Sequence, residues 1–405
     1  MFLSIVNVGL RGLTMAGRFV LLVALGAYLA PEDVGLYALF AAASTWGVYL
    51  QGMEFHLFNV RELVAADRTA WPRRVRDAFA LYGVVFVGAC VVWLGMFGAG
   101  FLPMRLLGWF LAILALEHAV QELYRLLNAF GRPLAGSIVL LARSGSWMYV
   151  VAALMWRVPS LRSLDAVWAG WVVGGAVALA LSIVFLRDLA WKNLSRIDWT
   201  WLRRGLAVGL PLLAGSLAWR GITVFERWFL GYSQGDATLG VFGFFSAIAA
   251  ALPVLAESGV GAVLYPRMMK AWQTGDLPAY RAYVRRLWLT FAAFVVIAAP
   301  LALGAVLVAV PHLHSSAYED ELRVYYVLLV AAVIASVAAV PQYVLWTRHR
   351  DRTMIAISII GLVTAVAADL VLVPRHGALG AAFGQLGTVV LVFALRLYAV
   401  RTADR

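Results

Sequence analysis

The chain has 405 residues, of which 63% are hydrophobic and only 13% are charged, and its mean hydropathy is +0.86. No water-soluble core needs so much apolar surface, and long apolar runs recur from end to end. The formal net charge of +12 comes mostly from arginine. Because these bases follow the pattern of the apolar runs, we attribute the charge to membrane topology and expect no nucleic-acid partner.

The apolar runs predict a multi-pass membrane protein. Each is long enough to cross a hydrocarbon layer of roughly 30 Å, and none alternates apolar and polar residues as a transmembrane barrel strand does. We therefore expect an all-α polytopic fold with about twelve transmembrane helices. The expected spans are residues 6–29, 34–60, 78–101, 105–128, 134–156, 165–186, 205–230, 238–264, 286–310, 323–346, 353–373 and 378–399.

The loops between these spans differ in charge. Loops after even-numbered spans carry most of the bases, whereas loops after odd-numbered spans are poor in base and often acidic, as at Glu32-Asp33 and Asp236. The positive-inside rule then predicts that both termini lie in the cytoplasm. A composition rich in alanine and poor in lysine indicates a bacterial genome, so we expect the chain in a bacterial inner membrane. The bases of the even-numbered loops include Arg61, Arg68, Arg73, Arg74, Arg76, Arg187, Lys192, Arg196, Arg267, Lys270, Arg281, Arg285, Arg286, Arg348, Arg350 and Arg352.

An internal repeat predicts two halves. The stretch PEDVGLYALF at residues 31–40 matches GDATLGVFGFF at residues 235–245, and Glu54 corresponds to Glu257. An even number of spans per half makes the repeat parallel. We expect an N-terminal six-helix half at 1–190, a cytoplasmic interfacial linker at 191–204 and a C-terminal six-helix half at 205–405. The linker interleaves bases with Trp191, Trp199 and Trp201, a pattern typical of a segment on an anionic membrane surface.

Arginines inside the spans are candidates for substrate binding. Arg11 and Arg18 lie seven residues apart, as do Arg220 and Arg227, so each pair shares one face of its helix. A charge at the bilayer centre costs about 2.5–3.5 kcal/mol, so such groups must face a cavity, the bundle interior or a partner. We expect these four arginines, with Arg143, to hold an anion such as a pyrophosphate, whose oxygens suit the guanidinium fork.

Structural ion pairing is the alternative role for these arginines. Acidic residues inside the spans could neutralise them, and Glu117, Glu122 and Arg125 are spaced for pairing along one helix. Four acids are also candidate sites for coupling transport to H+ or Na+, namely Glu54, Glu257, Glu226 and Asp369. We expect no metal site and no cofactor, since Cys90 is the only cysteine and no GxxxxGK[ST] nucleotide-binding loop occurs.

Three motifs carry a resemblance to a known family. LAPEDVGLY at residues 29–37 follows an arginine-bearing first helix, Glu226-Arg227 precedes Leu230-Gly231, and LVPRHGALGAA occupies residues 372–382. Their order and spacing resemble those of the Wzx-type flippases, which export lipid-linked oligosaccharides such as O-antigen units for lipopolysaccharide. These flippases belong to the multidrug/oligosaccharidyl-lipid/polysaccharide exporter superfamily. One departure is that Glu226 stands where the family usually has aspartate.

The resemblance implies a fold and a mechanism. It implies a V-shaped bundle with a central cavity that opens alternately to each side of the membrane, without enzymatic activity. The implied substrate is an undecaprenyl-pyrophosphate-linked oligosaccharide, with a polysaccharide polymerase as a candidate partner. Two related functions remain open: a multidrug exporter of the same superfamily, whose cavity should be acidic to bind cations, and a lipid II-type flippase, which usually has more spans.

Overall fold

The computed structural model describes residues 2–189, 191 and 196–403, and this part of the chain is helical without any strand. Ten stretches within it are long and apolar enough to cross a membrane. One of them, Asp351–Thr402, contains both spans expected after residue 350. The helix Pro31–Gly52 (α2) is not among the ten, although its residues 34–52 fall within the expected second span. These helices confirm the predicted all-α, multi-pass class.

The chain divides into two compact units. Unit 1 comprises residues up to 29 and residues 40–217, and unit 2 comprises residues 30–39 and residues from 218 onward. The division therefore falls inside α2 and inside the long helix Trp199–Gln234 (α9). Residues 30–39 precede most of unit 1 in the chain but pack with unit 2, a long-range grouping that local sequence pattern does not predict.

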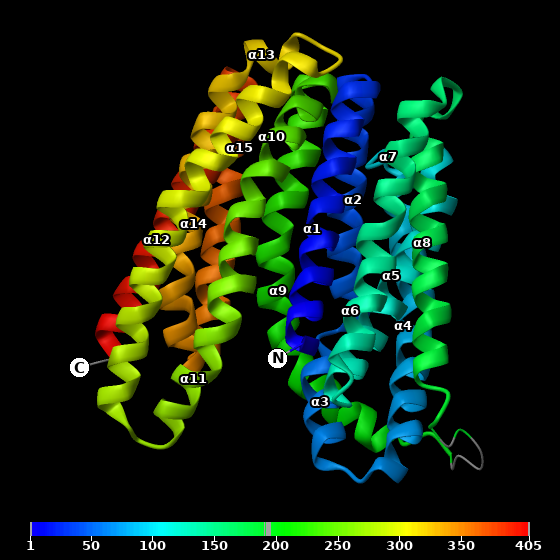
Figure 1. Cartoon of the computed structure of the whole chain (residues 1–405), viewed down its shortest axis with the longest axis vertical. Helices are drawn as coiled ribbons and strands as arrows, with labels where there is room; N and C mark the ends of the chain where they lie inside the picture. The colour runs from blue at the N-terminus through cyan, green and yellow to red at the C-terminus, as the bar shows by residue number, and fades with distance from the viewer. Residues whose placement is uncertain (1, 190, 192–195, 404–405) are drawn as a thin grey trace. The chain divides into compact units, whose positions relative to one another are not determined.

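Unit 1 is a bundle of helices that run side by side (Figure 1). Within it, α1 packs against α6 and α7, and α5 packs against α8. Besides its parts of α2 and α9, the unit contains α1 (Phe2–Tyr28), α3 (Phe55–Ala65), α4 (Trp71–Gly98), α5 (Leu107–Ala129), α6 (Pro133–Leu141), α7 (Trp147–Arg157) and α8 (Leu164–Phe185).

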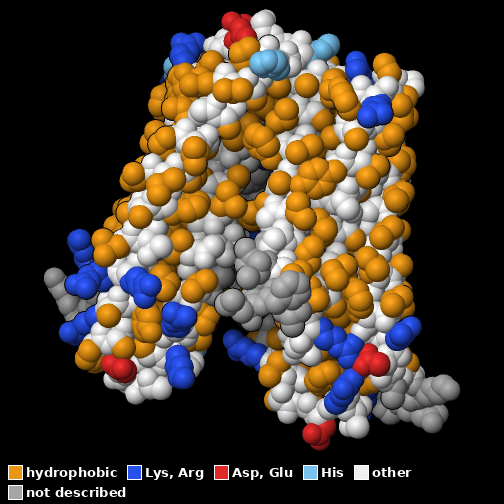
Figure 2. All heavy atoms as spheres, in the orientation of Figure 1, with side chains coloured by type: hydrophobic (Ala, Val, Ile, Leu, Met, Phe, Trp, Pro, Cys, Tyr) orange, Lys and Arg blue, Asp and Glu red, His pale blue; other side chains and the backbone are white. Residues whose placement is uncertain are grey.

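Unit 2 is built around one central helix, α14, which packs against α10, α12 and α15. Figure 2 shows hydrophobic side chains along the middle of the visible helices and basic side chains gathered toward their ends, as a membrane-spanning protein requires. Besides its parts of α2 and α9, the unit contains α10 (Asp236–Ala256), α11 (Ala262–Gln273), α12 (Leu277–Ala309), α13 (Ala317–Asp320), α14 (Leu322–Thr347) and α15 (Asp351–Ala403).

Local sequence explains where several helices begin and bend. The Ser163 hydroxyl accepts a hydrogen bond from Ala166 N at the start of α8, and Asp276 Oδ1 accepts one from Ala279 N, 3.0 Å away, at the start of α12. Gly235, with φ of 87°, separates α9 from α10. Gly377, with φ of 55°, kinks α15 between its two expected spans.

The expected second span is interrupted at its glutamate. Met53 and Glu54 both have φ of 51°, a left-handed conformation that costs a non-glycine residue about 1–2 kcal/mol, and α3 begins directly after them. A Cβ on Gly209 of α9 would approach Met53 O to 2.4 Å, so only glycine lets α9 pack on this turn. In unit 2 the corresponding residue, Glu257, opens a π-helical segment, Glu257–Gly261, between α10 and α11.

The two copies of the sequence repeat pack on each other in unit 2. A Cβ on Gly35 would approach Asp236 O to 2.4 Å, and one on Gly240 would approach Pro31 O to 1.8 Å. The first turns of α2 and α10 therefore cross at backbone distance through a glycine in each copy. This contact accounts for the shared glycine of the two motifs and for the place of residues 30–39 in unit 2.

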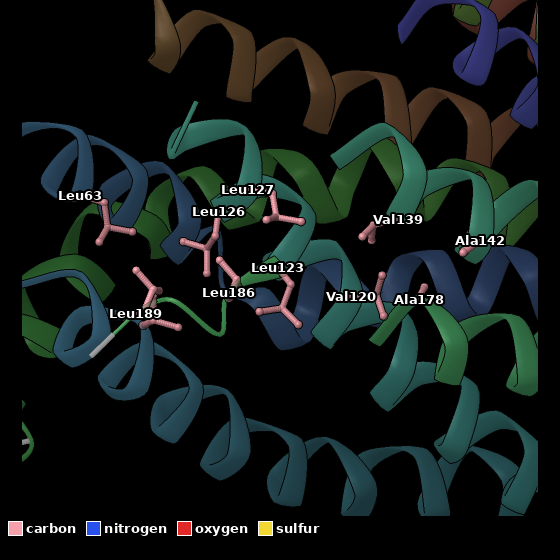
Figure 3. Close-up of a cluster of buried hydrophobic side chains, with 11 residues drawn as sticks. Leu63, Val120, Leu123, Leu126, Leu127, Val139, Ala142, Ala178, Leu186 and Leu189 are labelled. Atoms are coloured by element: carbon pink, nitrogen blue, oxygen red, sulfur yellow. The ribbon is translucent and has the colours of Figure 1, made fainter. Parts of the chain in front are cut away.

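A buried apolar cluster fixes α3, α5, α6 and α8 in unit 1. Figure 3 shows its side chains converging, with Leu63 from α3 and Leu123, Leu126 and Leu127 from α5. Lipid is as apolar as leucine, so close packing and not exclusion from water holds such a cluster together. The cluster covers one face of α5, Tyr124 packs at its edge, and the opposite face carries Gln121, Arg125 and Asn128.

The expected interfacial linker is only partly described, because Lys192 and residues 193–195 lie outside the described residues. Trp191 and Trp199 are exposed, as an interfacial segment requires. Trp201 is instead fully buried against Phe55, with the Arg74 guanidinium 4.4 Å from its ring centroid, and the interfacial position of the linker stays a prediction. The place of Trp201 near the start of α9 makes it part of the core of unit 1.

Ion pairs tie the loops of unit 1 to its helices. Arg132, after α5, donates to both carboxylate oxygens of Asp188, after α8, and Arg68 also pairs with this aspartate. The hydrogen bonds from Arg132 lower the pKa of Asp188 to about 2, so this carboxylate stays charged at any physiological pH.

Candidate functional site

The two predicted arginines of α1 occupy exposed positions in unit 1. Arg11 Nη2 lies 3.5 Å from the hydroxyl of Tyr124 on α5, although the two residues are 113 positions apart in the chain. Arg18 lies two helical turns further along α1, also on the surface of the unit. Their seven-residue spacing thus places both guanidinium groups on one side of α1, as predicted.

Arg11 opens onto a basic recess within unit 1. The recess has a volume of about 490 Å³ and lies between α1, α3 and α5. Its wall contains three arginines and no acid among the described residues. The lining residues are Arg11, His56, Leu57, Val60, Arg61, Tyr124, Arg125, Asn128 and Ala129.

Residues at helical spacing on α5 and α3 form the wall of the recess. Arg125 and Asn128 lie three residues apart on α5 and share the face opposite the buried leucines, and Tyr124, one turn before Asn128, lies at the edge of the leucine cluster. His56, Leu57, Val60 and Arg61 likewise occupy one side of α3. The left-handed turn at Met53–Glu54 sets where α3 begins, and so it determines which side of α3 meets the recess.

The arginines of the recess differ in how far they are neutralised. Arg125 pairs with Glu122 on its own helix, and the hydroxyl of Tyr82 donates to the other oxygen of that glutamate at 2.9 Å. The predicted local pairing of Glu122 with Arg125 is confirmed. Arg11 and Arg61 have no carboxylate within ion-pairing distance in the described part of the chain. Their charge is therefore directed at the recess and the surrounding solvent.

Glu54 lies behind the recess wall. Its carboxylate is buried, and Oε2 lies 3.3 Å from Nδ1 of His56. Its described partner is therefore the neighbouring histidine, and none of the predicted arginines. The reason is the tight turn at 53–54, which folds the glutamate back toward the first turn of α3.

Arg143 is enclosed in a second polar cluster of unit 1. Its Nε donates to Glu117 Oε2 at 2.8 Å, its Nη2 donates to Gln121 Oε1 at 2.9 Å, and both charged side chains are buried. Trp171 Nε1 donates to the remaining oxygen of Glu117 at 2.8 Å. Glu117 thus pairs across helices with Arg143 and not along α5, where its spacing had suggested a local partner.

The predicted residues of unit 2 lie mostly on α9. Arg220 is half-buried, and Arg227 lies seven residues further along. Arg227 Nη1 donates to Ala38 O at 2.6 Å, and Nη2 lies 3.5 Å from the Ser246 hydroxyl. Arg227 therefore fastens the first part of α2 to α9 and α10 within unit 2. The convergence of the α1 and α9 arginines on one anion stays a prediction.

Two buried carboxylates of unit 2 lie within electrostatic reach of each other. Glu226 on α9 and Asp369 on α15 are 5% and 2% exposed. Asp369 Oδ2 has no hydrogen-bond partner in the described part of the chain, and a Cβ on Gly384 would lie 2.9 Å from Oδ1. Glu257 is exposed instead, with the buried Arg396 as its charged neighbour.

Sequence reasoning missed several polar groups. Arg396 on α15 is 5% exposed, donates to Ala338 O at 3.3 Å and lies 5.3 Å from the ring centroid of Trp219. Arg396 is the one base within the last expected span, residues 378–399, and this isolation could have marked it as a buried polar group. His56, Tyr124 and Asn128 gave only weak signals, because one polar residue per turn is common on any helix.

Comparison with solved structures defines the class of the fold. An inward-facing multidrug resistance MATE family transporter of the MOP superfamily superposes with a TM-score of 0.77 at 13% identity, covering 99% of each chain. The lipid II flippase MurJ in an inward closed conformation gives 0.74 at 12% identity, covering 99% of this chain and 87% of that one. An outward-facing MATE transporter gives 0.64 at 14% identity, covering 99% and 94%. The chain thus has the fold of the multi-pass MOP-superfamily transporters and flippases.

The family follows from the sequence itself. The chain belongs to the polysaccharide biosynthesis protein family, whose model matches residues 4–272. That range contains α3, α5, α9 and all of α1 but its first two residues, and therefore the whole basic recess. No curated protein sequence matches the chain significantly.

Proposed function

We propose that the chain is a flippase that moves an undecaprenyl-pyrophosphate-linked oligosaccharide from the cytoplasmic to the outer leaflet of the bacterial inner membrane. The observation that carries the proposal is the basic recess, in which Arg11 and Arg61 have no carboxylate partner among the described residues, in a member of a polysaccharide biosynthesis family. A pyrophosphate cannot cross hydrocarbon without a substitute for its lost hydration. Guanidinium groups in a water-filled recess supply that substitute and match the geometry of phosphate oxygens.

The described contacts suggest which arginines bind the substrate and which support the site. Arg11 and Arg18 on α1, with Arg220 on α9, are proposed to contact the pyrophosphate during alternating access. Arg143 already pairs with Glu117 and Gln121, and Arg227 Nη1 already donates to Ala38 O, so we propose that these two support the site structurally. A multidrug exporter is the less favoured function, since cationic drugs would be repelled by the recess.

Coupling to H+ or Na+ is proposed to involve Glu226 and Asp369. The pair is buried in unit 2, and Asp369 Oδ2 is unpartnered in the described structure, so a proton or a small cation would relieve the unfavourable burial of two like charges. Glu257 has the cationic Arg396 as its neighbour, so it has less need of an added cation, whereas Glu54 contacts only the imidazole of His56. Transport by Asp369→Asn in proteoliposomes should no longer respond to an imposed proton or sodium gradient; an unchanged response would exclude Asp369 as a coupling site.

Complementation tests the proposed function. The unaltered chain should restore surface glycan in a flippase-null strain that makes the matching glycan, and an Arg18→Ala/Arg220→Ala variant should insert normally but restore little. Normal glycan display by the double variant would remove these arginines from the mechanism. Failure of the unaltered chain to restore any glycan, together with efflux of a cationic dye, would favour the multidrug exporter.

A further inference from the structure

One end of unit 2 presents a row of exposed bases on two consecutive helices. We refer to Arg267 and Lys270 on α11 with Arg281, Arg285 and Arg286 on α12 as the α11–α12 basic surface. All five side chains are exposed, and Figure 2 shows basic side chains gathered over the lower ends of these helices. The recess described above lies in unit 1, so this surface is a separate feature.

The helices that carry these bases are firmly packed on their other side. Leu264, Met268 and Ala271 of α11 are buried at three- and four-residue spacing, together with Tyr280 and Leu287 of α12. Both helices are therefore amphipathic, with an apolar face against the unit and a cationic face toward its surroundings. Such a helix, rich in arginine and lysine, is suited to a position at the membrane interface.

Contacts among Trp272, Tyr280 and Arg348 fix α11 against α12. The rings of Trp272 and Tyr280 lie 5.0 Å apart, and the Arg348 guanidinium lies 5.3 Å and 5.7 Å from their centroids. Arg348 Nε also donates to the Tyr280 hydroxyl at 3.3 Å. The five bases thus project from a fixed scaffold, and a ligand that binds them need not order a flexible loop.

The charge of this surface is not compensated within the described structure. None of its five bases lies within ion-pairing distance of a described carboxylate, whereas loop bases of unit 1 pair with acids, as Arg68 does with Asp188 and Arg73 with Asp198. The nearest acid in sequence, Asp276, caps α12 through Ala279 N. Five uncompensated cations in a compact region require anions from outside the chain.

Exposed apolar side chains lie one turn deeper than the bases. Val263 precedes Arg267 by one turn and is 54% exposed, and Leu289 follows Arg285 by one turn and is 65% exposed. Bases beside exposed apolar groups match the boundary between phosphate headgroups and acyl chains. A soluble phosphate or an acidic protein would leave those apolar side chains uncovered.

We propose that the α11–α12 basic surface binds the headgroups of anionic phospholipids in the adjacent leaflet, and that this binding stabilises unit 2. The proposal does not depend on the transported substrate. Removing one base near a membrane surface should weaken the attraction about fivefold at low salt. Neutralising three bases should therefore lower the affinity for an anionic lipid by about a hundredfold.

The test compares two variants of equal net charge. The full chain is purified in a neutral detergent, and phosphatidylglycerol or phosphatidylcholine is added. Retained lipid is counted by native mass spectrometry, and the thermal denaturation midpoint is measured. Arg281→Gln/Arg285→Gln/Arg286→Gln should lose the preference for phosphatidylglycerol and its stabilising effect. The control Arg105→Gln/Arg157→Gln/Arg323→Gln, which removes three bases elsewhere, should keep both.

Several results of this experiment would contradict the binding of anionic lipid. Equal retention of phosphatidylglycerol by the test variant and the unaltered chain would overturn it, as would equal binding of the two lipids by the unaltered chain. If the test variant does not fold, Arg281→Lys/Arg285→Lys/Arg286→Lys should keep the lipid preference, and rising salt should abolish it in the unaltered chain. A preference that salt does not change would also contradict the proposal.

Discussion

Arg11 and Arg143 lie on helices of the same unit, yet the fold treats the two arginines differently. Arg143 is buried and satisfied by Glu117 and Gln121, so it contributes to the packing of unit 1. Arg11 is exposed beside an open recess, and its one described contact is a long one to a tyrosine hydroxyl. A phosphate could therefore bind Arg11 without breaking an existing ion pair, and for this reason we propose Arg11, and not Arg143, as the substrate ligand.

Substitution of Arg61 tests whether the recess binds the transported substrate. We expect Arg61→Ala to slow flipping of a fluorescent pyrophosphate-linked lipid in proteoliposomes by about tenfold or more, since a lost charge-assisted hydrogen bond is worth about 1.5–3 kcal/mol. Arg61→Lys should be intermediate, because lysine keeps the charge but loses the fork. Arg105→Ala, an exposed base outside the recess, serves as the control. Equal rates for all variants would exclude Arg61 from substrate binding.

The Arg143–Glu117 pair predicts a loss of stability and not of substrate contact. Arg143→Met leaves Glu117 buried without its cationic partner and should cost about 3–5 kcal/mol. Arg143→Met/Glu117→Gln should recover part of this loss, because no charge remains unpaired and Trp171 keeps an acceptor. The thermal denaturation midpoint in detergent measures both effects. A single variant as stable as the unaltered chain would show that the pair does not hold unit 1 together.

At the level of elements, several helices are interrupted where they carry polar groups. The expected second span breaks at Met53–Glu54, and π-helical segments occur at Ala142–Ser146, around Arg143, and at Glu257–Gly261. Such interruptions turn a side chain away from the helix's regular stripe and toward a neighbouring helix or a recess. In the described structure they place Glu54 beside His56 and Arg143 beside Glu117.

The glycine crossing of α2 and α10 gives a prediction at this level. Gly240→Ala would bring a Cβ to 1.8 Å from Pro31 O, so the helices must separate, at a cost of about 1–3 kcal/mol or more. Gly304→Ala on α12 meets nothing within 4 Å and should be neutral or slightly stabilising, because alanine favours helix. Thermal denaturation of the two purified variants measures the difference. Equal stability of the two variants would contradict the close crossing.

For the molecule as a whole, structural similarity persists where sequence identity is only 12–14%. Apolar spans of sufficient length and loops of the right charge can be built from many sequences, so the fold tolerates extensive substitution. Function is more restrictive, because it depends on a few groups placed on that scaffold. We propose that the residues of the basic recess are such groups, because their charge would attract an anionic lipid-linked substrate and repel a cationic drug.

The charge pattern of the loops predicts the orientation in the membrane. A fluorescent protein fused after Arg405 should fluoresce, and alkaline phosphatase inserted after His314 should be active, because the C terminus is expected in the cytoplasm and the loop near residue 314 outside. Activity assays of the two fusions in intact bacteria check this. The opposite pattern would mean that the chain has an odd number of spans or an inverted orientation.

The sequence by itself determined the class, the expected spans, the repeated glycine motif and the arginine face of α1. These properties depend on composition and on periodicity within one helix, which neighbours in the chain are enough to specify. Only the tertiary structure decided which charges are neutralised: Arg143 finds Glu117 26 residues away, and Arg11 meets Tyr124 113 residues away. It also decided that residues 30–39 pack with unit 2. Partner choice depends on how helices pack across long chain separations, and helical periodicity carries no information about that packing.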